Sequence, residues 1–243
     1  MSAFTGRHCV VTGVTSGIGR ATTLKLLAEG ATVTGLGRSE EKLLALAAQV
    51  GAKFDFLVAD LAVAGERERV AAALRRARRP VDVFVSNAAE AAYASPLAIA
   101  PHDLLRLFEV NVCAPLELCQ AVVPAMPASG HVVQLSSVAA RFVPNAKFGP
   151  YAVTKAAVTG LIDALRLELA PRGIRVTSIA PGLVDTPIYD DLSGFTDLKK
   201  KLGEQVPNWL KPEDIAETVA WVLSRPPNVV VTELSVMPRG QAR

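Results

Sequence analysis

Tyr151 and Lys155 are the residues whose types and spacing could carry out proton transfer. They begin and end the segment Tyr-Ala-Val-Thr-Lys, and positions four apart lie on one face of a helix. A lysine ammonium beside a tyrosine stabilises the phenolate, so such a pair can release and take up a proton. Because this spacing also arises by chance, its meaning depends on the elements around it.

Short β-branched runs alternate with longer segments of helical spacing along the chain. The seven expected strands cover residues 8–13, 31–37, 53–60, 81–87, 130–137, 174–182 and 229–238. Strands separated by helices form parallel sheets with helices on both faces. The sequence therefore predicts an α/β fold of the Rossmann type, doubly wound, with a seven-stranded parallel sheet. Half of the 243 residues are hydrophobic, so we expect one domain over 1–243.

The composition argues against several partners. A formal net charge of +3 is too small to favour nucleic acid or an anionic membrane. The run Arg-Arg-Ala-Arg-Arg at 75–79 offers a weak nucleic-acid-binding alternative, but it is expected at a helix end, where the dipole favours cations. Cys9, Cys113 and Cys119 lack the spacing of a zinc site, so we expect no metal. Without a signal peptide or an apolar run of about 20 residues, a cytoplasmic protein is expected.

Three glycines mark a strand-to-helix turn directly after the first expected strand. Gly13, Gly17 and Gly19 belong to the segment Thr-Gly-Val-Thr-Ser-Gly-Ile-Gly. Backbone without side chains lets a pyrophosphate approach, and the helix that follows presents free N–H groups to it. The same glycines could form a tight turn that binds nothing, so the loop predicts a dinucleotide site only together with other motifs.

The second expected strand ends at Gly37 and Arg38. Enzymes that prefer NAD usually place a carboxylate here to hold the ribose hydroxyls, whereas Arg38 could pair with a 2′-phosphate. A surface arginine in a turn is one alternative. A second is that Glu40 or Glu41 reaches the ribose, although both are expected in the first turn of a helix, directed at its amino end.

Several short motifs follow one another in a fixed order. They are the glycine segment at 12–19, Asp60-Leu61, Ser-Asn-Ala-Ala at 86–89, Ser-Ser at 136–137, Tyr-Ala-Val-Thr-Lys at 151–155 and Pro-Gly at 181–182. In this order and spacing the chain resembles the short-chain dehydrogenases/reductases over essentially its whole length. The resemblance implies bound NADP(H), with Asp60 at the adenine, Asn87 along the cofactor and residues 181–186 at the nicotinamide. The implied cofactor-binding residues are Gly13, Thr15, Ser16, Gly17, Ile18, Gly19, Arg38, Ser39, Asp60, Leu61, Asn87, Ala88, Tyr151, Lys155, Pro181, Gly182 and Thr186.

The resemblance also implies a catalytic set, which falls on Asn111, Ser137, Tyr151 and Lys155. Tyr151 would exchange the proton, Ser137 would hold the substrate oxygen, and Asn111 would hold a water that connects Lys155 to solvent. Lowering the tyrosine pKa by about three units needs ~4 kcal/mol, which one cation at about 4 Å supplies at an effective dielectric constant near 20. We therefore expect Lys155, helped by the charge of the oxidised nicotinamide, to lower the pKa of Tyr151. Ser136 is an equally good strand-end serine, but Ser137 matches the family's second serine.

Several positions depart from the family pattern near the expected substrate mouth. Ser86 and Ala89 replace an asparagine and a glycine, Glu90 follows, and Ala140 replaces another glycine. The segment 137–151 is one residue longer than usual. These changes leave the four catalytic positions intact and bear on the identity of the substrate.

Residues 183–211 interrupt the alternation of strands and helices. They follow an expected strand, at the end where open α/β sheets bind ligands, so we expect a substrate flap there. The candidate walls of the substrate pocket are Ile188, Tyr189, Phe195, Trp209, Tyr93 and Phe142. They favour a medium-sized, partly apolar carbonyl compound.

Together the motifs predict an NADP(H)-dependent oxidoreductase that interconverts a carbonyl (ketone or aldehyde) and an alcohol. The alternative is a protein of the same fold that senses or binds NADP(H) without turnover, and the intact catalytic set weighs against it. The helix from about Tyr151 to Leu169 carries more apolar surface than one core-facing stripe needs. Because family members commonly pair through this helix, we expect a homodimer or homotetramer.

Overall fold

The computed structural model describes residues 3–77, 79–190, 192 and 194–241. Seven parallel strands form one sheet in the order β3-β2-β1-β4-β5-β6-β7, which confirms the predicted architecture. The strands are β1 (His8–Thr12), β2 (Thr32–Gly37), β3 (Phe54–Val58), β4 (Val83–Ser86), β5 (His131–Leu135), β6 (Arg175–Pro181) and β7 (Glu233–Val236). The strand order reverses direction between β1 and β4, and such a switch point opens a crevice at the carboxyl ends of the strands.

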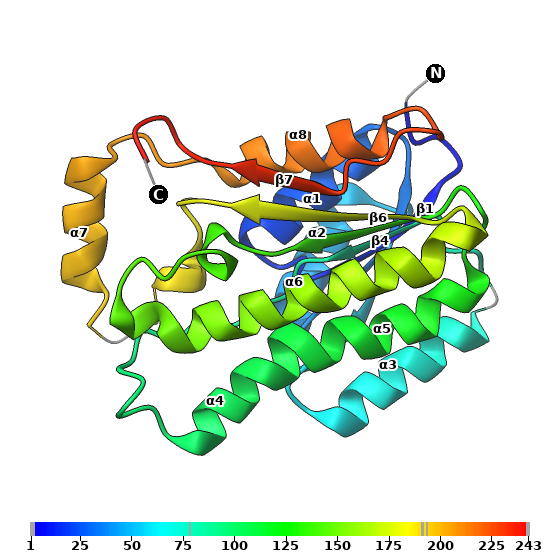
Figure 1. Cartoon of the computed structure of the whole chain (residues 1–243). Helices are drawn as coiled ribbons and strands as arrows, with labels where there is room; N and C mark the ends of the chain where they lie inside the picture. The colour runs from blue at the N-terminus through cyan, green and yellow to red at the C-terminus, as the bar shows by residue number, and fades with distance from the viewer. Residues whose placement is uncertain (1–2, 78, 191, 193, 242–243) are drawn as a thin grey trace.

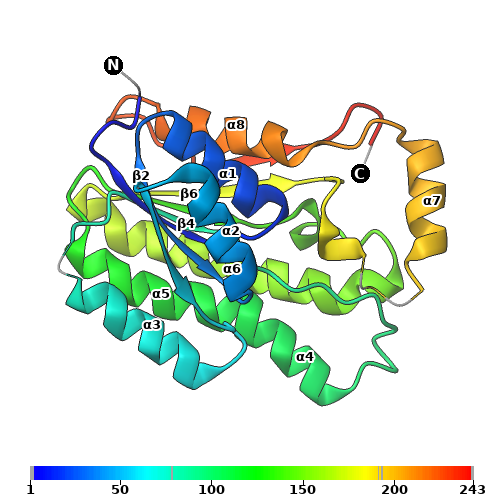
Figure 2. The same ribbon diagram turned by 180° about the vertical axis from the view of Figure 1, so that it is seen from behind.

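Helices cover both faces of the sheet (Figure 1). The helices are α1 (Gly17–Ala28), α2 (Glu40–Val50), α3 (Ala64–Arg76), α4 (Pro101–Phe108), α5 (Ala114–Val122), α6 (Gly149–Leu169), α7 (Thr196–Gln205) and α8 (Pro212–Leu223). Figure 2 shows α1, α2 and α8 on one side, while α3, α5 and α6 lie on the other. The two faces have separate cores, one built around Leu26, Leu43 and Ile215 and one around Val70, Leu118 and Ile162.

The central strands are buried on both sides, including the few polar residues in their sequences. Every residue of β1, β4, β5 and β6 is buried, which is typical of a parallel sheet covered by helices. The edge strand β7 is shorter than the predicted strand 229–238, with only Glu233–Val236 pairing to β6. The buried core thus fixes the carboxyl ends of the central strands, which position the candidate site.

A turn of π-helix at Glu109–Cys113 joins α4 to α5 into one helical segment. The segment Pro101–Ala125 is long and apolar enough by composition to cross a membrane, although the sequence analysis expected no such run. Half of its most apolar window is buried inside the protein, as expected for a helix that packs in a core. Cys119 in this segment and Cys9 in β1 are buried free thiols, and Cys113 is a half-buried one.

The basic run at 75–79 closes α3. Arg75 and Arg76 lie in its last turn and are exposed, and Arg78 lies outside the described residues. Cations at this end interact favourably with the helix dipole. The exposed arginines therefore have an explanation within the fold itself.

The predicted flap at 183–211, of which residues 191 and 193 lie outside the described residues, has a closed base. Val184 and Leu210 pair as an isolated parallel bridge, and the Asp185 amide donates to the Leu210 carbonyl at 2.8 Å. The excursion contains the short turn Pro187–Tyr189 and the helix α7. The two ends of the flap are therefore fixed to each other, next to the carboxyl end of β6.

Candidate active site

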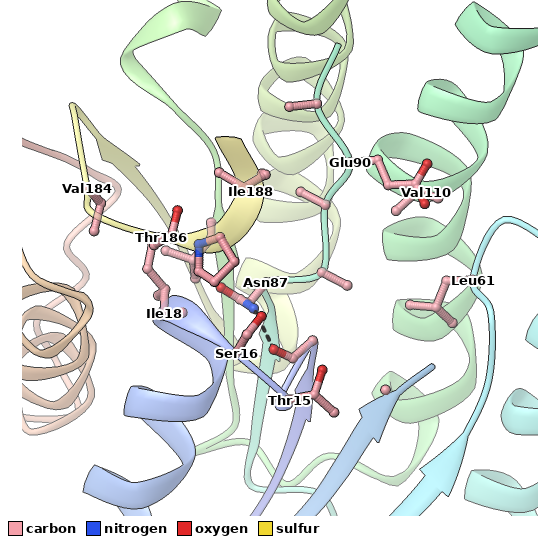
Figure 3. A pocket seen from close by; sticks show the side chains of 18 of the residues that line it. Thr15, Ser16, Ile18, Leu61, Asn87, Glu90, Val110, Val184, Thr186 and Ile188 are labelled. Carbon is pink, nitrogen blue, oxygen red and sulfur yellow. Dashed lines mark hydrogen bonds between the residues drawn. The ribbon is translucent and has the colours of Figure 1, made fainter. Parts of the chain in front are cut away.

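A cavity of about 570 Å³ opens at the carboxyl ends of the strands. Its walls come from the turns after six strands, from α6 and from the flap. Figure 3 shows Thr15 and Ser16 at one end of it, with Glu90 and Val110 across the pocket from Thr186 and Ile188. The cavity brings together every expected cofactor-binding residue except Gly19, and every expected catalytic residue except Asn111.

The glycine turn is shaped by close backbone packing. Gly13 and Gly17 have φ angles of +74° and +49°, in the left-handed region that favours glycine. A Cβ atom on Gly19 would lie 2.2 Å from the Gly13 carbonyl oxygen. Gly19 therefore acts through packing rather than as part of the wall, and the amino end of α1 faces a cradle of bare backbone. This cradle fits a pyrophosphate.

Thr12 and Asn87 join this turn to the loop after β4. The Thr12 hydroxyl accepts hydrogen bonds from the backbone amides of Asn87 and Ala88, both at 2.9 Å. The Asn87 side-chain amide donates to the Thr12 carbonyl at 2.9 Å. The floor of the cavity is thereby held at the point where the strand order reverses.

One end of the cavity is charged. Arg38 and Lys42 both line it, and Lys42 was not predicted from the sequence, because a lysine in the third position of α2 carries no motif. The Arg38 side chain donates to the Glu90 carboxylate at 2.9 Å. Burial acts to raise the pKa of Asp60, but hydrogen bonds from the Ala62 amide and from Arg106 outweigh it, so that pKa lies below its ordinary value.

Glu40 and Glu41 occupy the first turn of α2 and do not line the cavity. Ser39 caps this helix by accepting from the Lys42 backbone amide at 3.3 Å. The carboxylates thus lie where the helix dipole favours them. This arrangement argues against the alternative in which one of them holds the ribose.

Tyr151 and Lys155 lie in the first two turns of α6 and both line the opposite end of the cavity. The Lys155 side chain is buried, and its Nζ atom donates to the Leu135 carbonyl at 3.0 Å. The same Nζ atom lies 5.7 Å from the centroid of the Tyr151 ring. The helical spacing predicted from the sequence therefore does place both groups on one face.

The pKa of Tyr151 lies above its ordinary value, opposite to the sequence-based expectation. Burial is the main cause and the neighbouring Tyr189 adds to it, while the hydrogen-bonded Ser137 hydroxyl acts in the other direction. Burial also lowers the pKa of Lys155 to about 8. Desolvation is thus the largest cause of both shifts. At neutral pH the phenol carries its proton.

Ser136 and Ser137, which follow β5, have different hydrogen-bond partners. The Ser136 hydroxyl is paired with that of Thr159 on α6 at 2.8 Å. Ser137 accepts from the Ala139 amide at 3.1 Å and lies beside the Tyr151 phenol. The geometry favours Ser137 as the serine that meets a substrate.

Asn111 lies within the π-helical turn and does not line the cavity. Its side chain accepts from the Glu90 amide at 2.9 Å and donates to the Glu90 carbonyl at 2.8 Å. It also donates to the Thr154 hydroxyl at 2.9 Å. Asn111 therefore ties the loop after β4 to α6, and its expected role in holding a water stays a prediction.

The predicted substrate walls divide into two groups. Ile188 and Tyr189 line the cavity, together with Leu192, which the sequence analysis did not select. Phe195, Trp209, Tyr93 and Phe142 do not line it. The first three of these pack into an aromatic cluster with Tyr189 and Phe148. Aromatic side chains at isolated sequence positions thus stabilise the flap by packing on one another.

Known proteins share this fold. The short chain dehydrogenase family matches residues 7–195. Serine 3-dehydrogenase of Agrobacterium fabrum is 34% identical over 236 residues, which cover 96% of this chain and 94% of that protein. An uncharacterized oxidoreductase of Staphylococcus epidermidis is 32% identical over 231 residues, covering 94% and 96%. The closed form of a serine dehydrogenase complexed with NADP+ superposes with a TM-score of 0.89 at 29% identity, covering 97% of this chain and 96% of that one.

These likenesses extend over nearly the whole chain, which belongs to the short-chain dehydrogenase family. It is accordingly an oxidoreductase, and the members of this family use a nicotinamide cofactor. The resemblance inferred from the order of the sequence motifs is confirmed.

Replacing Tyr151 by phenylalanine should remove the expected proton donor while keeping the ring that lies beside Lys155. We expect the variant to fold and to bind cofactor, but to lose about 10²- to 10⁴-fold in kcat. Lys155→Ala should lose turnover too and should also bind cofactor more weakly. Steady-state kinetics and cofactor titration measure both effects, and a Tyr151→Phe variant within about tenfold of the parent would remove the tyrosine from its role.

The pH profile of the carbonyl reduction expected from the sequence should follow Lys155. Its ammonium form is present below its pKa of about 8 and is lost above it, while the phenol keeps its proton over the same range. We expect kcat/KM for reduction to be flat from pH 6 to 7.5 and to decline above about pH 8. A profile that stays flat to pH 10, measured in buffers of constant ionic strength, would contradict the assigned role of the ammonium.

Proposed function

We propose that the protein is an NADP(H)-dependent oxidoreductase that interconverts an uncharged ketone or aldehyde and its alcohol. One observation carries the proposal: Ser137, Tyr151 and Lys155 converge at one end of a cavity whose other end holds the glycine cradle and Arg38. A cavity of this arrangement can hold a long dinucleotide with its reactive end beside a proton donor.

Each catalytic side chain has a task in this proposal. Bound NADPH would supply the hydride. The Tyr151 phenol, which is protonated at neutral pH, would donate its proton to the oxygen of the carbonyl. The Ser137 hydroxyl, beside the phenol, would hold that oxygen in place, and the buried Lys155 ammonium would stabilise the phenolate left behind.

The phosphate-bearing cofactor is favoured by the charges at the far end of the cavity. Arg38 and Lys42 are cations on its wall, and no carboxylate stands at position 37 to accept the ribose hydroxyls. A guanidinium makes charge-assisted bonds to a phosphate. The serine dehydrogenase of similar structure is complexed with NADP+, and a metagenomic short-chain oxidoreductase with a TM-score of 0.81 at 28% identity is in complex with NADP.

Beyond the catalytic set, apolar side chains line the substrate end of the cavity, and no described lining residue there is acidic. Among the described lining residues, the charged ones are Arg38, Lys42, Asp60 and Glu90 at the far end and the catalytic Lys155. Ile188, Tyr189 and Leu192 face the substrate region instead. A free amino acid would bring its ammonium there without an acidic partner. We therefore propose a neutral, partly apolar substrate, unlike the serine named for two of the relatives.

A cytoplasmic location and a homodimer or homotetramer stay predictions. For pairing through α6, the supporting feature is the exposure of Val153 and Leu167 on that helix. Apolar side chains exposed on one helix are typical of surfaces that pair with a second copy.

The cofactor preference can be tested directly. Charge-assisted bonds contribute about 1.5 to 3 kcal/mol each, so we expect at least a roughly tenfold higher kcat/KM with NADPH than with NADH. Arg38→Leu should remove most of this preference with little effect on NADH kinetics. A reversal through Gly37→Asp also requires Thr15 to rotate, because a Cβ atom on Gly37 would lie 2.8 Å from Thr15 Cγ2. Equal use of the two cofactors by the parent would remove Arg38 from phosphate binding.

A matched substrate panel tests the reaction and the polarity of the pocket. We expect NADPH-dependent reduction of neutral ketones and aldehydes, and oxidation of L-serine at least 100-fold less efficient in kcat/KM than that of a neutral secondary alcohol of similar size. Cofactor binding without turnover of any carbonyl would favour the alternative of a binding protein. Efficient oxidation of L-serine would overturn the proposal of a neutral substrate, but not the proposal of an NADP(H)-dependent oxidoreductase.

A further inference from the structure

The Glu90 carboxylate, expected from the sequence near the substrate mouth, is instead the centre of a charged network with Arg38 and Arg106 at the cofactor-binding end of the cavity. Arg106 of α4 binds it in a bidentate manner, with Nε to Oε2 at 2.9 Å and Nη2 to Oε1 at 2.7 Å. Arg38 Nη1 donates to the same Oε1 at 2.9 Å. Arg106 Nη2 also reaches Asp60 at 3.2 Å. Two arginines from distant parts of the chain therefore share one carboxylate.

The two arginines hold Glu90 with unequal strength. Arg106 makes two parallel bonds, the geometry in which guanidinium and carboxylate interact most strongly. Arg38 makes a single bond, and its side chain is 64% exposed, so its contact is screened by water. The Arg38 contact is consequently the one that a competing anion can replace.

We propose that Arg106 is a positioning residue that neutralises Glu90 and so leaves Arg38 available to the 2′-phosphate of NADP(H). The inference rests on the proposed function, because it concerns the same cofactor site. Without Arg106, the Glu90 carboxylate would bind Arg38 more strongly and would repel the phosphate. With Arg106 in place, Glu90 is a weak temporary partner that holds Arg38 at the rim of the cavity.

The balance of charge gives the sign of each effect. The network and Lys42 bring three cations, Arg38, Lys42 and Arg106, against the two carboxylates of Glu90 and Asp60. Removing Arg106 makes this end less positive, and removing Glu90 makes it more positive. Removing both restores the net charge of the parent. A 2′-phosphate responds to these changes, whereas the ribose hydroxyl of NADH does not.

The backbone around Glu90 does not depend on its side chain. Asn111 holds both the amide and the carbonyl of Glu90, and the loop is further anchored at Thr12 through Ala88. Neutral substitutions at positions 90 and 106 should therefore keep the loop in place. This allows a charge effect to be separated from a loss of structure.

Fluorescence titration of the purified full chain with NADPH and with NADH tests the proposal. We expect Arg106→Gln to weaken NADPH binding about tenfold and Glu90→Gln to leave it unchanged or tighten it. The double variant should return to within about threefold of the parent. NADH affinity should change less than twofold throughout. Arg20→Gln is the matched control, since Arg20 bonds to Gln49 outside the cavity.

Three results would overturn the proposal. These are an unchanged NADPH affinity in Arg106→Gln, an equal loss of NADPH and NADH affinity, and a failure of Glu90→Gln to rescue Arg106→Gln. If a thermal melt shows that Arg106→Gln is unfolded, Glu90→Gln alone tests the inference. Weaker NADPH binding by the Glu90→Gln variant then contradicts it. A parent that binds no NADPH would instead contradict the proposed function.

Discussion

The close approach of the first turn to the loop after β4 is the constraint on which the cavity depends. Gly13 and Gly19 pack backbone against backbone. The side-chain amide nitrogen of Asn87 would be 2.4 Å from any Cβ at position 19. Thr12 completes the junction by bonding to two amides of the neighbouring loop. Because the turn leaves no room for side chains, the amino end of α1 faces the cavity with its N–H groups uncovered.

Burial governs the chemistry at the other end. The Lys155 ammonium lies inside the protein with a backbone carbonyl as its hydrogen-bond partner, and the half-buried Tyr151 ring lies beside it. Desolvation disfavours the charged form of both groups, so it raises one pKa and lowers the other. The two pKa values move apart, so the phenol keeps its proton while the lysine titrates near pH 8. The π-helical turn at Glu109–Cys113 adds a second constraint by tying this region to the loop that carries Glu90.

Much of the fold and part of the candidate site could be predicted, because both depend on local patterns. Alternating apolar runs determine the strands, and fixed spacings put Tyr151 and Lys155 on one helix face. Pairing between distant residues has no such signature. Arg38 and Glu90 are 52 positions apart, and nothing in either segment indicates that they meet. Likewise, Phe195 and Trp209 could be recognised as aromatic, but only the packed structure shows that they contact other rings instead of the cavity.

The aromatic cluster gives the flap a particular dependence on temperature. Phe195 is fully buried, with its ring stacked on Tyr189 at 4.9 Å and edge-on to Tyr93 at 5.5 Å. Lifting the flap would expose these rings to water, and exposure of apolar surface increases the heat capacity. The free energy of flap opening is then a nonlinear function of temperature. If product release requires flap opening, the Eyring plot of kcat is curved, even when the chemical step alone would give a straight line.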